Sequence, residues 1–144
     1  MVRDDVAKAV AGGEVHVTIV EAVRAVLGKY ATFSGRARRS EYWYWTLAVL
    51  IADVVARVVD GVLGVSLLTV VLGLAVIVPG IAVSVRRMHD TGRSGWFLLL
   101  GLIPLVGAVI LIVWFCGDSK PGDNVYGPSP KGGQTYGYGP PTTL

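Results

Sequence analysis

The sequence predicts an all-α integral membrane protein, a helical bundle of three spanning helices preceded by an amphipathic helix at the membrane surface. Two long runs without a charged residue indicate this fold class, Gly61 to Val85 and Trp96 to Cys116. At about 1.5 Å per residue, either run is long enough to cross a hydrocarbon layer about 30 Å thick. Composition agrees, because 53% of the 144 residues are hydrophobic and only 16% are charged.

The chain has room for one membrane domain, which we expect over residues 17–130. Residues 1–16 are mixed in charge, and we expect them to be loosely ordered. Seven glycines and five prolines fall among the last 28 residues, which predicts a disordered Gly/Pro/Tyr-rich tail over 131–144. One cysteine and two histidines supply neither an intrachain disulfide nor a zinc-ligand set, so we expect no metal and no cofactor.

The first predicted helix, over 17–30, has apolar residues at helical spacing with charged residues between them. It is too short to cross a membrane. Two placements remain open: flat on the membrane surface, or packed on the ends of the spanning bundle. The apolar positions are Val20, Val23, Val26 and Leu27, and the charged ones are Glu21, Arg24 and Lys29.

A basic stretch over 36–39 runs into the aromatic residues 42–45, a pattern typical of the point where a chain enters a membrane. The spanning helix expected over 42–60 carries Asp53 and Arg57, and Asp60 closes it. A charge near a helix centre costs about 2.5–3.5 kcal/mol on insertion scales, whereas each Leu, Ile or Val contributes only about 0.3–0.6 in return. Insertion of this helix alone is therefore marginal.

The charged face of that helix has two interpretations. Arg57 lies four residues after Asp53 and three before Asp60, so we expect it to pair with both acids on a face that points into the bundle. This face is either a salt bridge that holds helices together or part of a proton or ion route. A route of this kind needs a transporter built from several copies or with a partner, because three spans are too few alone.

The second spanning helix is expected over 62–85, where Pro79 removes a backbone hydrogen bond and predicts a kink. The third is expected over 96–116. Positive charge then predicts orientation, because the clustered arginines fall in 36–39 and 86–95, which an odd number of crossings places together on the cytoplasmic side. The C-terminal tail is accordingly expected on the outer side.

Three blocks of the sequence stand in order with apolar segments between them. They read FSGRARRSEYW from Phe33, RRMHDTGRSGW from Arg86 and GDNVYGP from Gly122. These blocks resemble the signature of the small bacterial inner-membrane proteins grouped as domain of unknown function 805. The resemblance implies a bacterial inner-membrane location and a small helical bundle, and it implies no activity.

The two arginine blocks share one side of the predicted bundle, which leaves three uses open. In the first use, Glu41 and Asp90 pair with arginines of the opposite block, and together they form a polar knot, a network of ion pairs that fixes the helix ends. Alternatively, the arginines form a pocket for an anionic lipid headgroup or a soluble phosphate, because a guanidinium binds phosphate oxygens through two nitrogens. In the third use, His89 and Asp90 act in catalysis, although sequence neighbours rarely form a catalytic pair. The predicted anion-binding residues are Arg36, Arg38, Arg39, Arg86, Arg87, His89 and Arg93.

We favour binding over catalysis, because the sequence lacks a Gly-x-Ser-x-Gly elbow, a phosphate loop and a paired-histidine metal site. The prediction is a small accessory or regulatory protein whose cytoplasmic arginines bind anionic lipid or a partner, with no catalytic residue assigned. Partners are then membrane lipids, a membrane protein or further copies of this chain. Nucleic acid is not expected, because headgroups engage these basic clusters first. The alternatives are a membrane-embedded enzyme acting on a lipid or phosphate compound, and a transporter subunit.

Overall fold

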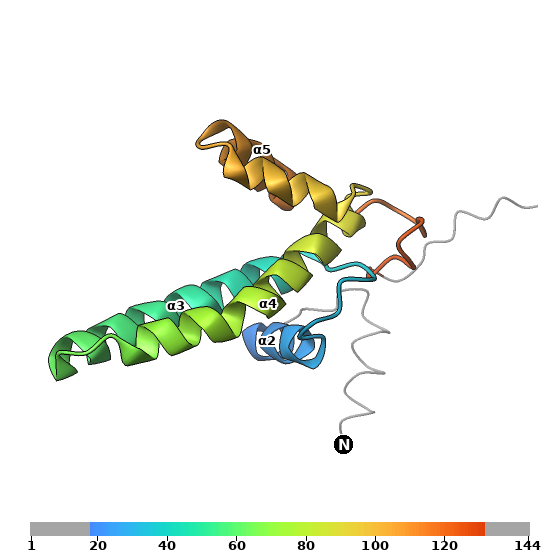
Figure 1. The fold of residues 1–144 in the computed structure, drawn as a ribbon. Coiled ribbons are helices and arrows are strands. Elements are labelled where there is room, and N and C mark those ends of the chain that lie inside the picture. Colours follow the sequence, from blue (N-terminus) through green and yellow to red (C-terminus); the bar gives the residue numbers. More distant parts are fainter. Residues whose placement is uncertain (1–17, 132–144) are drawn as a thin grey trace, which may run out of the picture.

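The computed structural model describes residues 18–131, and this part of the chain is helical without a β-strand. The helical class predicted from the sequence is confirmed. The predictions for residues 1–16, and for the tail beyond residue 131, lie outside the described residues. In chain order the elements are α2 (Ile19–Gly28), α3 (Arg39–Leu63), α4 (Leu67–Asp90), the 3₁₀ helix η1 (Gly95–Leu102) and α5 (Val106–Cys116) (Figure 1).

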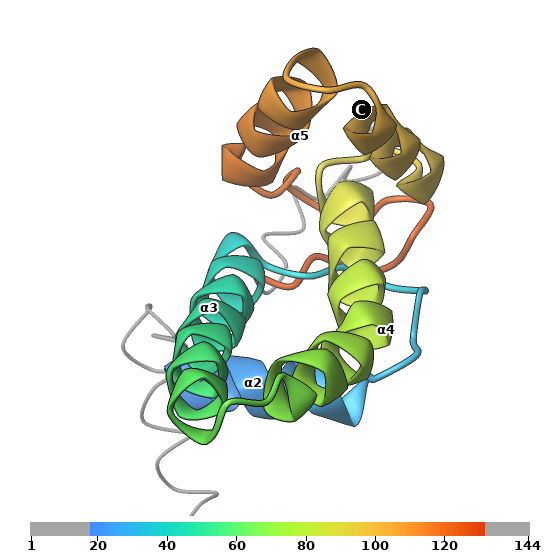
Figure 2. The ribbon, with the colours of Figure 1, turned by 60° about the vertical axis from the view of Figure 1, so that its left-hand side comes forward.

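Helices α3 and α4 form a long antiparallel hairpin and lie side by side in both ribbon views (Figures 1 and 2). With 25 and 24 residues they are about 37 and 36 Å long, enough to cross a bilayer core. Gly64 ends α3 with φ 67°, a left-handed conformation that suits glycine and turns the chain into α4. Among the described helices, α4 alone combines the length and the hydropathy of a membrane span.

Helix α2 packs across the α3–α4 hairpin (Figures 1 and 2). Thr18 and Glu21 begin it with a capping box, because the Glu21 amide donates to Thr18 Oγ1 at 3.2 Å and the Thr18 amide donates to Glu21 Oε2 at 2.8 Å. Val26 is buried in one apolar cluster with Trp45 of α3 and Val83 of α4. The structure therefore packs this helix on the side of the bundle, and its placement at the membrane surface stays a prediction.

The single helix expected over 96–116 is replaced by a helical hairpin, so that expectation was wrong. Pro104 has no amide hydrogen, and Leu105 adopts φ 60°, which breaks the helix between η1 and α5. Gly107 makes the turn compact, because a Cβ at this position would lie 1.6 Å from the Leu100 carbonyl oxygen. The two halves therefore run back along each other.

The chain returns through α5 to the end where η1 began. Trp114 near the end of α5 packs edge-on against Phe97 of η1, with ring centroids 5.6 Å apart. With 11 residues α5 is about 16 Å long, half the thickness of a bilayer core. The described fold thus holds two membrane-length helices and a short apolar hairpin, so three spanning helices are not confirmed.

Candidate functional site

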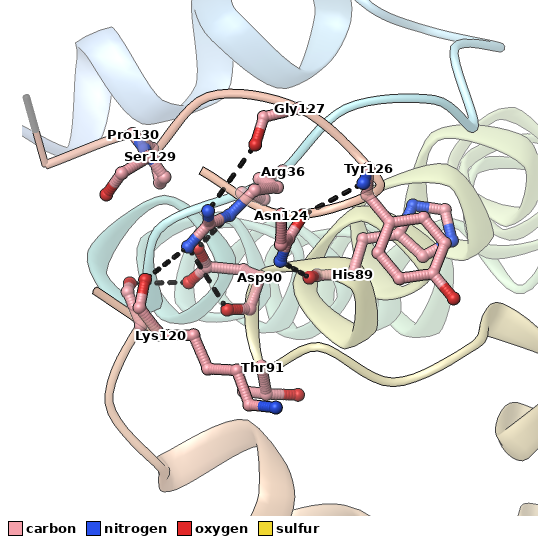
Figure 3. A network of polar contacts seen from close by, with 12 residues as sticks. Arg36, His89, Asp90, Thr91, Lys120, Asn124, Tyr126, Gly127, Ser129 and Pro130 are labelled. Carbon is pink, nitrogen blue, oxygen red and sulfur yellow. Dashed lines mark hydrogen bonds and ion pairs between the residues drawn. The ribbon is translucent and has the colours of Figure 1, made fainter. Parts of the chain in front are cut away.

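Three segments meet at one end of the α3–α4 hairpin, where α3 begins and α4 ends. They are the segment before α3, the C-terminal turn of α4, and residues 117–130 after α5. We call this region the arginine end, and Figure 3 shows its central contacts. Residues 120, 122 and 130 of the segment after α5 contact the arginine blocks directly. This segment therefore lies at the same end of the hairpin as the blocks, whereas an odd number of crossings would have placed it at the opposite end.

Asp90 is the centre of the arginine end. Its carboxylate is fully buried and accepts from Arg36 Nε at 3.0 Å and from Arg87 Nη1 at 2.5 Å. Ser119 Oγ also donates to it. Two guanidinium groups on one carboxylate explain how three charges stay buried together, because each has an opposite charge within hydrogen-bond distance.

Arg36 ties the C-terminal segment to this centre. Besides Asp90, its guanidinium donates to the carbonyl oxygen of Lys120 at 2.6 Å (Figure 3). It also donates to the carbonyl oxygen of Gly122 at 2.7 Å. A longer contact of 3.5 Å reaches the carbonyl of Gly127. Its donors are thus used inside the protein, and Arg36 is not placed to hold an external anion.

Arg87 ties the returning end of α5 to the same centre. Its Nε and Nη2 donate to the Phe115 carbonyl oxygen at 3.2 and 3.1 Å, and Nη2 also donates to the Gly117 carbonyl. The last carbonyls of a helix have no partner within the helix, so an arginine here satisfies them. This contact holds the short hairpin to α4.

Arg86 faces a different partner. Its Nη1 donates to Glu41 Oε1 of α3 at 2.7 Å, which joins the two long helices by a buried ion pair. Its Nε and Nη2 are also buried, and they have no hydrogen-bond partner among the described residues. Together with Arg36 and Arg87, this arginine is a structural part of the arginine end, as the predicted polar knot requires.

His89 and Asp90 point to different partners although they are adjacent. The His89 ring stacks on Tyr126, with centroids 3.9 Å apart and planes 1° from parallel (Figure 3). His89 Nδ1–H donates to the Gly35 carbonyl oxygen at 3.1 Å. Neither contact orients the ring toward the Asp90 carboxylate, so the geometry contains no His–Asp catalytic pair.

The other predicted arginines lie at the periphery. Arg38 donates through Nε to the Pro130 carbonyl, and the exposed Arg39 reaches the Cys116 carbonyl at 3.4 Å. The Arg93 guanidinium lies over the Trp114 ring, 4.6 Å from its centroid. Its Nη1 makes one long contact of 3.5 Å to the Thr91 carbonyl oxygen. The rest of the guanidinium edge stays available for hydrogen bonds, because the stacking uses only its flat side.

A pocket of about 560 Å³ opens beside Arg93. Sequence reasoning missed most of its lining, because five of the eight lining residues come from α5 and the segment after it, among them Trp114, Asp118 and Lys120. Asp118 is paired with Lys131 at 2.5 Å, and this hydrogen bond lowers the pKa of the carboxyl below its ordinary value. The complete lining is Thr91, Gly92, Arg93, Val113, Trp114, Gly117, Asp118 and Lys120.

The charges predicted for the first spanning helix do not join the arginine end. Arg57 pairs with Asp53 at 2.7 Å on the surface of α3. Asp60 is instead buried where α4 begins, and its carboxylate accepts the amides of Leu68 at 3.1 Å and Thr69 at 2.8 Å. The expectation that Arg57 pairs with both acids was therefore wrong, because Asp60 caps the next helix. The expectation that this charged face points into the bundle was wrong as well.

A family model described as protein of unknown function (DUF805) matches residues 30–128 of this chain. The chain belongs to the DUF805 family. It is 45% identical over 112 residues to inner membrane protein YhaH of Escherichia coli K12, covering 74% of this chain and 93% of that protein. To inner membrane protein YhaI of the same strain it is 43% identical over 111 residues, covering 76% and 94%.

These relatives, together with α4, support a bacterial inner-membrane location for this DUF805 protein. No solved structure matches the chain significantly. The three signature blocks meet at the arginine end: Arg36 and Glu41 come from the first, Arg86 to Asp90 from the second, and Gly122 to Gly127 from the third. Within residues 18–131, no group of three metal-ligating side chains is found.

Proposed function

We propose that this protein is a non-enzymatic accessory protein of the inner membrane that binds anionic lipid headgroups at the arginine end, on the cytoplasmic side. The observation that carries the proposal is the pocket lined by Arg93, Lys120 and Trp114. Arg36 and Arg87 donate within the protein, so the headgroup site is narrower than the seven residues expected from the sequence. It centres on Arg93 and Lys120.

The charges around the pocket favour an anion. Asp118 is the one acid in the lining, and Lys131 pairs with it. This leaves Arg93 and Lys120 to act on a ligand. A phosphodiester of a lipid headgroup is an acceptor-only anion that suits an arginine edge and a lysine together.

The position of the pocket favours a lipid over a soluble phosphate. Trp96 is 79% exposed at the start of the apolar hairpin, and Trp114 lies in the pocket wall. Tryptophan is enriched at headgroup depth, where its ring is apolar and its N–H is solvated. Exposed apolar residues of the short hairpin, such as Leu102 of η1 and Leu105 of the turn, then lie where acyl chains run.

The test is native mass spectrometry of the purified protein in detergent with added phosphatidylglycerol, phosphatidylcholine or inorganic phosphate. We expect a retained phosphatidylglycerol adduct that is weakened in the Arg93→Gln and Lys120→Gln variants. Arg24→Gln removes the same charge from the exposed surface of α2 and is the matched control. Equal retention of phosphatidylglycerol by all variants would refute the headgroup site. If the protein instead retains another protein and no lipid, and this retention depends on Arg93, the pocket is a site for a protein partner.

A further inference from the structure

One face of α3 carries a regular seam that no described element covers. The seam consists of Leu47, Leu50, Val54, Arg57 and Gly61, which alternate spacings of three and four residues. This is the heptad pattern by which two helices pack along their length. Leu47, Leu50 and Val54 are 42%, 57% and 52% exposed, and the Arg57 side chain is 65% exposed. The opposite face of α3 packs on α2 and α4.

Charge on this seam is out of place in a lipid-facing surface. Arg57 lies six residues before the end of α3 and Asp53 ten, so their depths are about 9 and 15 Å from that end. Asp53 is therefore near the middle of a hydrocarbon layer about 30 Å thick. Ionised residues at this depth almost always face protein or a water-filled cavity, because lipid offers them no hydrogen bonds.

We propose that the seam packs against the same seam of a second copy, in a parallel two-fold dimer. Membrane insertion gives both copies the same orientation, so a two-fold axis along the membrane normal places equal residues at equal depth. Asp53 flanks the seam beside Val54 and carries the charge opposite to that of Arg57. Each Arg57 then bridges its own Asp53 and the Asp53 of the other copy, giving a closed group of four charges with no net charge.

The local geometry suits this arrangement. Side chains on a helix lean toward its N-terminus, so Arg57 reaches back to the level of Asp53 on either helix. Its Nε already lies 2.7 Å from Asp53 Oδ2 of the same chain. The Arg57 side chain is 65% exposed, so its guanidinium is accessible to a second acceptor. Gly61 has open space where a Cβ would stand, which lets two helices approach closely at this level.

Charge complementarity singles out a second copy as the occupant. A lipid phosphate reaches Arg57 from the membrane surface but leaves Asp53 without a partner in hydrocarbon. A copy of the same seam supplies one acid and one base at matching depths. The charges of α3 make its independent insertion marginal. Association with a second copy compensates this cost, because each charge then has a partner in the membrane.

The first test is disulfide cross-linking in native membranes. Cys116 is the single cysteine of the chain, so Cys116→Ser gives a cysteine-free background. In that background we compare Val54→Cys on the seam with Val55→Cys, which is similarly exposed at 56% but lies off the seam. We expect a cross-linked dimer for the Val54→Cys variant and none for the Val55→Cys variant. No dimer at position 54, or equal amounts at both, overturns the proposal.

The second test separates contact between copies from the pairing within one helix. Asp53→Arg and Arg57→Asp chains carry different affinity tags and are expressed singly or together. Each alone places like charges on both seams, so we expect self-association to be lost. Together they restore opposite charges between copies, and we expect co-purification of the two tags. Self-association of either single variant, or no gain on mixing, contradicts the proposal. The membrane-inserted amount of each variant is measured. If a charge variant fails to insert, the cross-linking comparison of Val54→Cys with Val55→Cys, which changes no charge, tests the dimer instead.

Discussion

Two carboxylates on neighbouring helices each pair with an arginine about one helical turn away, but their surroundings are opposite. Asp90 lies three residues after Arg87 on α4, and both side chains are 0% exposed. Asp53 lies four residues before Arg57 on α3, and these side chains are 32% and 65% exposed. Spacing along a helix predicts both pairs. The neighbours that tertiary structure brings decide that the first is a structural centre and the second a surface feature.

The largest expected effect comes from substituting Asp90, the buried carboxylate of the two. Asp90→Asn leaves Arg36 and Arg87 buried with their shared countercharge removed, and losing one partner of a buried pair costs about 3–5 kcal/mol. Asp53→Asn removes an exposed pair, which costs about 0–1 kcal/mol. The measurement is the free energy of unfolding in detergent, at a protein concentration chosen so that the chain is monomeric. Equal losses in the two variants would mean that Asp90 is not the centre of the arginine end.

A second variant sharpens the comparison within α3 itself. Asp60 accepts the Leu68 and Thr69 amides at the start of α4, the role of a helix N-cap. Asp60→Ala should therefore lower the free energy of unfolding by about 0.5–2 kcal/mol, more than Asp53→Ala does. Asp60→Asn keeps an oxygen acceptor and should recover part of the loss. A full loss in Asp60→Asn would show that the carboxylate charge matters and the cap does not.

The C-terminal segment provides a smaller test at the arginine end. Tyr126 stacks on His89, whereas its neighbour Val125 is 93% exposed. We expect Tyr126→Ala to lower the free energy of unfolding by about 0.5–1.5 kcal/mol and Val125→Ala to leave it nearly unchanged. Amide hydrogen exchange of residues 120–127 should rise in the first variant alone. A rise in both would mean that the ring stacking does not hold this segment in place.

The smallest effect concerns pH. The hydrogen bond from Lys131 lowers the pKa of Asp118 below its value in the unfolded chain, so the pair stabilises the folded state above the ordinary carboxyl pKa. This contribution is lost as the pH falls through the lowered pKa. The difference in unfolding free energy between wild type and Lys131→Met should accordingly shrink between pH 7 and pH 3. A constant difference over that range would show that the ion pair is not its source.

Much of the fold could be predicted from local pattern. The uncharged run before Arg86 became α4, and the Thr18–Glu21 capping box begins the short helix expected before the spans. The run over 96–116 was misjudged because apolar composition cannot distinguish one long helix from two short ones. Pro104, Leu105 and Gly107 decide that difference through backbone conformation and a close approach to Leu100.

By itself the sequence determined that helices form where α2, α3 and α4 lie and that positive charge gathers in two blocks, because hydrophobic periodicity and charge are local properties. Only the tertiary structure decided what the arginines do. Carboxylates and backbone carbonyls from segments far apart in the chain satisfy Arg36 and Arg87, whereas Arg93 lies beside the pocket. The physical reason is that a buried charge must find its partners in space. Which carbonyl of residues 115–127 comes within hydrogen-bond distance depends on how the short hairpin folds back.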